Sequence, residues 1–196
     1  MGLFSWRPRI KRILTAGVCA AIVAFAAVAA AGTPAITQES IAGAKLGLSV
    51  RTYKKLIGKP FYKAPLNLPL RQTNQLWSRL EFSRLSVYFP PKKTRAAVIA
   101  TWERRYKTAA GLGPCSRIDD LKLTYGNRLK PAKLATKHGV VYAYTLGKNL
   151  LFESLNHSYV EVVALYNGSD PNVGKPGGSL DLAFHVALST RACRRD

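Results

Sequence analysis

The sequence has few of the residues that enzymes use for acid/base or metal chemistry. Its 196 residues include only ten Asp and Glu and three His. His138, His157 and His185 lie far apart, and none has metal-site spacing, such as two His four residues apart on a helix. A Ser nucleophile elbow, a phosphate-binding Gly loop and a His-flanked thiol are also missing. The sequence therefore predicts no catalytic residue, no metal and no cofactor.

The few carboxylates have structural explanations. Asp119 and Asp120 are adjacent, but neighbours on a helix point about 100° apart, and both suit the first turn of a helix. Glu153 and Glu161 fall on the outward registers of two expected strands, where they could form cross-strand ion pairs with Lys and Arg. Helix position and expected ion pairs thus explain these four carboxylates without catalysis.

Cysteine is scarce as well, with three in the chain. Cys19 lies in an N-terminal apolar run and follows Val18 rather than a small residue, which argues against a lipid-attached cysteine. Cys115 and Cys193 remain, and in an oxidising compartment two such cysteines most simply form a disulfide. Two buried or reactive thiols are the alternative.

The first 31 residues resemble an export signal. Four basic residues precede the uncharged run "ILTAGVCAAIVAFAAVAAA", which ends in small residues. This order is typical of a secretory signal peptide, and an uncleaved N-terminal anchor is the alternative. Residues 32–40 are polar and small and are expected to be a linker. We therefore expect a secreted or extracytoplasmic protein, either free or anchored by its N-terminal segment. An uncleaved leader would be its only contact with a membrane.

Positive charge dominates the rest of the chain. The whole sequence carries a formal net charge of +20, and 26 of its 30 Lys and Arg follow the leader together with all ten acids. Such an excess favours anionic partners, although charge that serves only solubility is the alternative.

Residues 41–108 are expected to form a helix followed by strands. Ser49 can cap a helix that Gly58 and Pro60 end, and a Pro-rich connection, 59–75, follows. The segments "LWSRLEF" (76–82), "RLSVYF" (84–89) and "RAAVIATW" (95–102) alternate apolar and polar residues, which is typical of an antiparallel meander.

Residues 109–196 repeat this order. Ser116 is expected to cap a second helix that Gly126 ends. Strands are expected at 139–146, 149–155, 159–167 and 180–190, with a loop at 167–179. The fold class is therefore α+β, with two tandem repeats, 41–108 and 109–196. Each repeat is a short helix followed by three to four antiparallel strands, and the two form one curved sheet.

The stretch "IAGAKLGLSVRTYKKLIGKP" (41–60) resembles the helix-opening motif of the small outer-membrane assembly lipoproteins of the BamE or SmpA type. Two such units in tandem also resemble the beta-lactamase inhibitory protein family. That resemblance implies a curved sheet whose concave face holds a partner protein. This chain departs from the first family in lacking a lipid-attachment cysteine, and from the second in its basic charge and single expected disulfide.

Aromatic and basic side chains mark the expected binding surface. Trp77, Arg79 and Tyr88 fall on one outward face of the first strands, unless the tryptophans belong to the core. The stretch "ATWERRYKT" (100–108) adds planar and cationic groups, and a tyrosine pair of the second repeat could continue the same surface. The remaining binding candidates are Trp102, Arg104, Arg105, Tyr142 and Tyr144.

The expected function is therefore binding without catalysis. One face of the antiparallel sheet is expected to bind a protein or an anionic envelope polymer. The alternative is an extracytoplasmic hydrolase or transferase with an unrecognised site. An export signal argues against nucleic acid as the partner, although charge alone permits it.

Overall fold

The structure is a computed structural model that describes residues 35–67, 76–136, 139–169 and 193. All of these belong to one compact unit, 31–196. Within the described residues the fold is α+β, with two α-helices, an eight-stranded sheet and a two-stranded sheet. The elements are β1 (Ser40–Ile41), β2 (Ala44–Lys45), α1 (Val50–Ile57), β3 (Tyr62–Asn67), β4 (Leu76–Phe82), β5 (Leu85–Phe89), β6 (Val98–Thr101), α2 (Ile118–Tyr125), the 3₁₀ helix η1 (Gly126–Arg128), β7 (Leu129–Thr136), β8 (Gly139–Leu146), β9 (Leu150–Ser154) and β10 (Val162–Tyr166).

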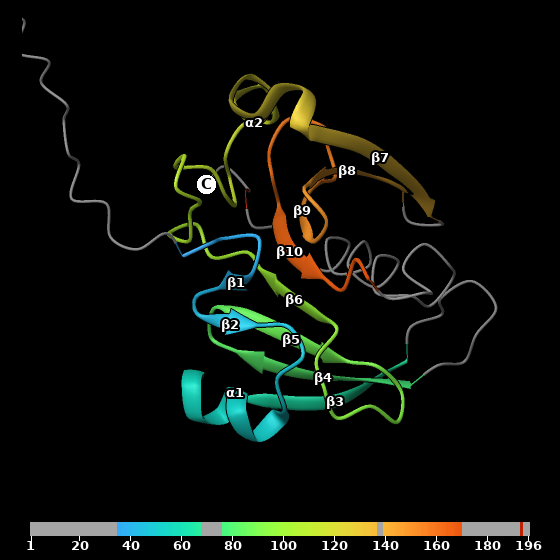
Figure 1. The fold of residues 1–196 in the computed structure, drawn as a ribbon. Coiled ribbons are helices and arrows are strands. Elements are labelled where there is room, and N and C mark those ends of the chain that lie inside the picture. The colour runs from blue at the N-terminus through green and yellow to red at the C-terminus, as the bar shows by residue number, and fades with distance from the viewer. Residues whose placement is uncertain (1–34, 68–75, 137–138, 170–192, 194–196) are drawn as a thin grey trace, which may run out of the picture. The chain divides into compact units, whose positions relative to one another are not determined.

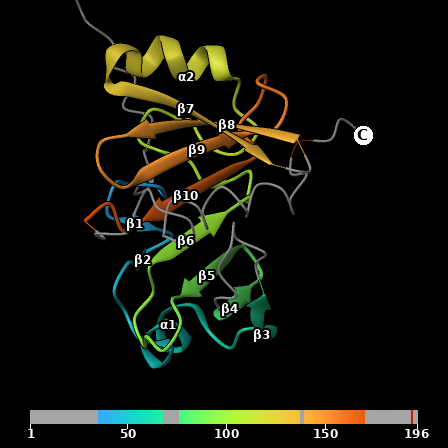
Figure 2. The same cartoon turned by 90° about the vertical axis from the view of Figure 1, so that its right-hand side faces the viewer.

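The large sheet has the strand order β3-β4-β5-β6-β10-β9-β8-β7, and its neighbouring strands are antiparallel (Figures 1 and 2). β6 and β10 meet in the middle, where Ala100 pairs with Ala164. β3 and β7 are the two edge strands. Each helix thus precedes an edge strand, and the chain then runs strand by strand to the centre of the sheet.

Helix α1 begins and ends where the sequence predicts. The Ser49 side chain accepts a hydrogen bond from the Thr52 N–H at 3.3 Å, which satisfies one of the first free amides of the helix. Gly58 ends the helix with φ 102°, a conformation that favours glycine. Tyr53 is fully buried and fixes the helix to the core.

Helix α2 ends at the predicted residue but does not have the predicted N-cap. It ends at Gly126 as expected, with φ 50° at that glycine. Ser116, however, does not cap the helix, because the N-cap residue is Arg117 and its side chain makes no capping hydrogen bond. The Ser116 hydroxyl instead accepts a hydrogen bond from the Gly113 N–H at 3.0 Å. Asp119 and Asp120 supply negative charge in the first turn, where the helix dipole favours it.

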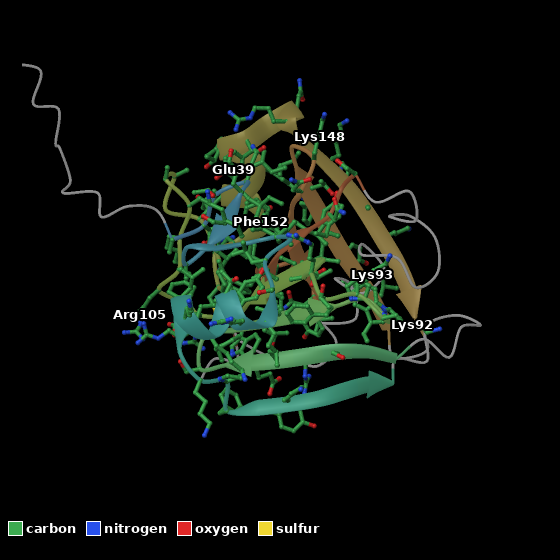
Figure 3. All side chains as sticks on the ribbon, turned by 60° about the horizontal axis from the view of Figure 1, so that its bottom comes forward. Glu39, Lys92, Lys93, Arg105, Lys148 and Phe152 are labelled. Atoms are coloured by element: carbon green, nitrogen blue, oxygen red, sulfur yellow. A yellow bond between two sulfur atoms is a disulfide. The ribbon has the colours of Figure 1, made fainter. Side chains whose placement is uncertain are left out.

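Both helices pack on the same face of the large sheet. Their buried residues, including Tyr53, Ile118 and Leu121, belong to one core with alternate side chains of the strands, among them Phe152 in the interior (Figure 3). The opposite side, which we call the far face, carries a second buried cluster. Its members are Trp77, Tyr88, Ala97, Val98, Ala100, Val141, Ala143, Leu151, Val162, Ala164 and Tyr166.

The sequence reading missed both edge strands. β3 lies in the segment expected to be a Pro-rich connection, and β7 follows α2 where no strand was expected. Each contains a proline, Pro65 paired with Ser78 and Pro131 paired with Tyr144. Proline lacks the N–H that a central strand needs but is tolerated at a sheet edge. The expected strand 180–190, with His185, lies outside the described residues.

The expected disulfide is present. Cys115 and Cys193 are joined, with their Cα atoms 5.3 Å apart and a sequence separation of 78. The Cys193 N–H also donates to the Glu161 carboxylate at 3.1 Å. This link ties residue 193 to the loop before α2 and to the start of β10.

Among the described residues, no helix has both the length and the apolar character needed to cross a bilayer. The expected leader, 1–31, lies outside those residues.

Candidate functional site

The far face brings Trp77, Arg79 and Tyr88 together from neighbouring strands. Trp77 and Arg79 occupy alternate positions of β4, and Arg79 pairs across the ladder with Tyr88 of β5. Directly opposed residues of antiparallel strands share a face. The period-two pattern of the sequence thus grouped these three side chains correctly in space.

Two of the three are buried. Trp77 and Tyr88 are each 2% exposed, so Trp77 has the core position that was the alternative to an outward one. Burial raises the pKa of Tyr88 to about 12, so its phenol is neutral at physiological pH. Arg79 is partly exposed, forms a 3.3 Å ion pair with Glu81, and places its guanidinium 5.2 Å from the ring centre of Tyr62.

Alanines lie among larger apolar side chains in the middle of the far face. Ala100 pairs with Ala164 across the central strands, and Ala164 pairs with Leu151 on the next strand. Val98 pairs with Tyr166 in a parallel row. All of these side chains are buried, so the middle of this face is part of a packed interior.

Polar groups without hydrogen-bond partners gather on this same face. Among the described residues, the buried side-chain atoms that lack a partner are Trp77 Nε1, Arg79 Nε, Ser86 Oγ and both carboxylate oxygens of Glu153. Ser86 lies on the far face because it alternates with core residues Leu85 and Val87 of β5. Buried polar atoms are nearly always satisfied, so several unsatisfied ones on one face need an explanation.

Glu153 corrects an expectation. It lies on the register predicted for it, but its carboxylate is fully buried and makes no ion pair with a described residue. Its neighbours in the ladder are Ala143 and Val162, which offer no hydrogen bond from their side chains. Burial therefore raises its pKa well above the ordinary value. Glu161 is also buried, at 7% exposed, and accepts its hydrogen bond from the Cys193 backbone rather than from a basic side chain.

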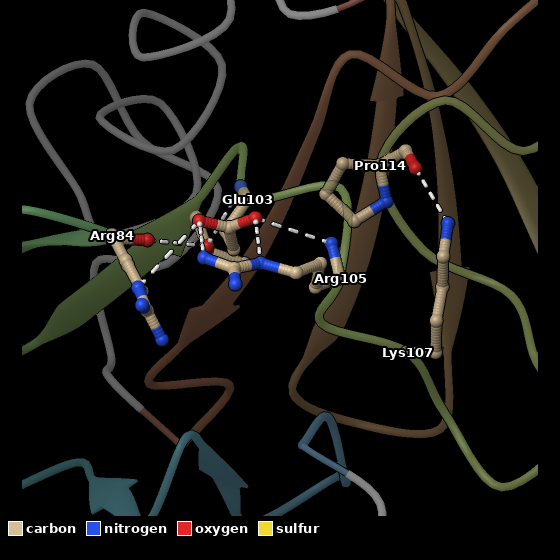
Figure 4. Close-up of polar contacts among 6 residues, drawn as sticks. Arg84, Glu103, Arg105, Lys107 and Pro114 are labelled. Carbon is tan, nitrogen blue, oxygen red and sulfur yellow. Dashed lines mark hydrogen bonds and ion pairs between the residues drawn. The ribbon is translucent and has the colours of Figure 1, made fainter.

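The loop after β6 holds Trp102, Arg104 and Arg105. Glu103 accepts a hydrogen bond from Arg105 Nε at 3.1 Å and pairs with Arg84 at 3.7 Å (Figure 4). The Arg105 hydrogen bond is the main cause that lowers the pKa of Glu103. Trp102 is half-buried, whereas Arg104 and Arg105 are exposed and Arg105 points away from the ribbon (Figure 3).

The loop then returns to the core through Lys107. Its Nζ donates to the Pro114 carbonyl at 2.7 Å (Figure 4). Partial burial lowers the pKa of this lysine. The exposed arginines therefore lie on a backbone that is fixed at both ends, at Thr101 and at Lys107.

The tyrosine pair of β8 does not continue the far face. Tyr144 belongs to the helix-side core and Tyr142 packs against it, so that expectation is wrong. Both tyrosines contact His157. The ring centres of Tyr142 and His157 are 4.5 Å apart, and the Tyr144 hydroxyl is 3.0 Å from His157 Nδ1. Lys122 Nζ lies 5.7 Å from the centre of the Tyr144 ring. Sequence alternation separates 142 and 144 from 141 and 143, but it does not say which pair turns toward the helices.

Within the described residues, no group of three or more His, Cys, Asp or Glu could hold a metal ion. Asp119 is exposed and pairs with Arg117 at 3.6 Å. Of the described carboxylates, those of Glu81, Glu103 and Asp119 form ion pairs, and that of Glu161 accepts a hydrogen bond.

No family model, no curated protein and no solved structure matches this chain. The site must therefore be interpreted from its own chemistry.

Proposed function

We propose that this chain is an exported, noncatalytic binding module whose far face binds a protein or an anionic envelope polymer. The proposed architecture is a tandem repeat, 41–108 and 109–196, whose sheets join into one curved surface. Supporting this, the order helix and four strands occurs twice, and the strand order places the two sets in mirror order about β6 and β10. The proposed relationship to BamE-type and beta-lactamase-inhibitory proteins rests on this order and on the motif at 41–60. The Cys115–Cys193 disulfide is compatible with an extracytoplasmic location.

The observation that carries the binding function is the set of unsatisfied polar atoms on the far face. The indole N–H of Trp77 and the carboxylate of Glu153 lie on it without hydrogen-bond partners. Each such group costs free energy, and a bound partner would recover it only where the face opens to admit that partner. The alanines and the two aromatic rings of this face are themselves buried, so they support the face from within and do not supply its contact area.

Access decides which residues make the first contact. Trp77 and Tyr88 are nearly inaccessible. Tyr62 is 44% exposed and shares the face with Glu81, its partner in the ladder. Tyr62 and the partly exposed Arg79, stacked on each other, are therefore the part of the far face that a partner meets without rearrangement.

The test is capture of partners from the chain's own envelope fraction by the full chain and by a double variant, Tyr62→Ala with Arg79→Ala. A matched control is Tyr125→Ala with Arg128→Ala, since Arg128 stacks on Tyr125 at 5.4 Å in the same way but beside α2. The proposal expects the first variant to lose at least tenfold in captured partner and the control to lose little. Equal capture by the first variant and the unmodified chain would refute it.

Salt then separates the two partner classes. Binding to a polyanion falls steeply as salt rises, because it depends on release of counterions. A contact made through a sheet face keeps much of its affinity, because buried contacts are screened less.

A further inference from the structure

A second surface, distinct from the far face, lies on α1 and the start of β3. From Ser40 to Leu80 the sequence has eight Lys and Arg and no Asp or Glu. Within this stretch Lys54, Lys55, Lys59 and Lys63 are all exposed. This is a concentrated positive surface in a chain that is already basic.

Exposed apolar side chains lie among these lysines. The described residues have five exposed large apolar side chains, and two of them, Leu56 and Phe61, fall within six consecutive positions. The adjacent Tyr62 belongs to the far face. Leu56 is 58% exposed and Phe61 is 68% exposed. A single exposed apolar residue needs no explanation, but a group of them on one short segment marks a surface that meets something apolar.

The backbone holds these side chains outward. Tyr53 is buried against Phe89, with ring centres 6.0 Å apart, and the Gly58 N–H donates to the Lys54 carbonyl at 3.1 Å. Just beyond the turn, the Phe61 N–H donates to the Glu81 carbonyl at 3.0 Å. Leu56 and Phe61 are therefore exposed on hydrogen-bonded elements and not on a free end.

Within the described residues, no ion pair neutralises the positive charge of the segment. Among the ion pairs of the described residues, none involves a residue from 51 to 63. The carboxylate nearest along the ladder, Glu81, is paired with Arg79. The lysines are therefore available to an external anion.

We propose that the segment from Lys54 to Lys63 docks on an anionic lipid bilayer. Leu56 and Phe61 insert among the acyl chains near the headgroups, and the lysine stems extend along the apolar boundary so that the ammonium groups reach the lipid phosphates. A soluble polyanion would use the lysines but would leave two large apolar side chains in water. The combination of both kinds of side chain on one segment therefore favours a bilayer surface.

The experiment measures partition of the full chain on vesicles by flotation. One vesicle is phosphatidylcholine alone, and the other is three parts phosphatidylcholine to one part phosphatidylserine. Each surface lysine contributes about fivefold to binding at an anionic membrane, so Lys54→Gln, Lys55→Gln and Lys59→Gln together should lower partition on the anionic vesicle about a hundredfold. Leu56→Ser with Phe61→Ser should lower it at least tenfold, because both side chains lose their apolar contact with the lipid.

Matched controls come from the other half of the sheet. Lys130→Gln, Lys133→Gln and Lys148→Gln remove the same charge from exposed positions, of which Lys148 is visible in Figure 3. Leu123→Ser with Val140→Ser removes apolar side chains that are 88% and 38% exposed. Both controls should keep partition within about threefold of the unmodified chain.

Three results would overturn the proposal. The unmodified chain could partition equally on the two vesicles, the lysine control could lose as much as the lysine variant, or the Leu56 and Phe61 variant could bind normally. The last result would leave a site for soluble polyanions instead. Because the substituted side chains are exposed, thermal unfolding of every variant should match the unmodified chain, which checks that lost binding is not lost folding.

Discussion

The buried carboxylate of Glu153 makes the folding stability of this protein depend on pH in an unusual direction. Burial raises the pKa of this carboxyl well above its ordinary value of 4.5. In the unfolded chain the group is solvated and ionises near that ordinary value. Below pH 4.5 both states are therefore protonated, and the group contributes no pH dependence. Above it the unfolded state loses a proton that the folded state keeps, so the stability falls as the pH rises toward the folded pKa.

The size of this pH dependence follows from the one proton that the unfolded state loses and the folded state keeps. Over the range between the two pKa values, the free energy of unfolding should fall by about 1.4 kcal/mol per pH unit because of this group. Ladder neighbours Ala143 and Val162 carry no charge that could offset this, and desolvation is the cause of the shift. Glu153→Gln keeps the shape of the side chain and removes the titration. The difference in stability between variant and unmodified chain should therefore widen as the pH rises.

Urea unfolding at a series of pH values above and below 4.5 measures this difference. Glu81→Gln is the control, because Glu81 is 20% exposed and paired with Arg79, and its loss should not stabilise the protein at higher pH. Glu153→Leu should stabilise further, since it also removes an unsatisfied buried polar group worth about 1–3 kcal/mol. A Glu153→Gln difference that stays constant with pH would refute the reasoning, since it would mean that the carboxyl titrates alike in both states.

Two further predictions concern the disulfide and the first helix. Cys193→Ser opens a loop of 78 positions, and the chain-entropy model expects a loss of about 4.5 kcal/mol in the free energy of unfolding. Urea unfolding measures this loss, and the unmodified chain should show the same loss after reduction of the disulfide. An unchanged urea midpoint would contradict the expectation. Ser49→Ala removes the side-chain cap of α1 and should cost about 1 kcal/mol, seen as a lower thermal midpoint, whereas Ser49→Asp should restore it. Failure of Ser49→Asp to do so would assign the loss to other contacts of Ser49.

Local signals in the sequence predicted much of the secondary structure. Ser49 and Gly58 bound α1 because capping and positive φ are decided within a few residues. The strand signals located β4, β5 and β6 in the first half and β8, β9 and β10 in the second. They failed for β3 and β7, where a proline interrupts the pattern, and the pairing of β6 with β10 depends on contacts that no local pattern specifies.

The candidate site was predicted in part for the same reason. Alternation put Trp77, Arg79 and Tyr88 on one face, because the face that a side chain takes depends only on its position within its own strand. Alternation does not reveal whether a face is buried, so it left open whether Trp77 belongs to the core and did not predict the burial of Glu153. The contact of His157 with Tyr142 and Tyr144 was also missed, because it joins a loop to a strand through tertiary packing.

The prolines of the two outermost strands also limit how the protein can associate. An unpaired edge is a template on which another chain can add a strand and on which fibrils can grow. Pro65 and Pro131 each remove one amide donor from such an edge, and exposed Lys130 and Lys133 add repulsion between copies along β7. Lateral extension of the described sheet is therefore disfavoured at both edges, so the protein can reach a high local concentration with less risk of edge-to-edge aggregation.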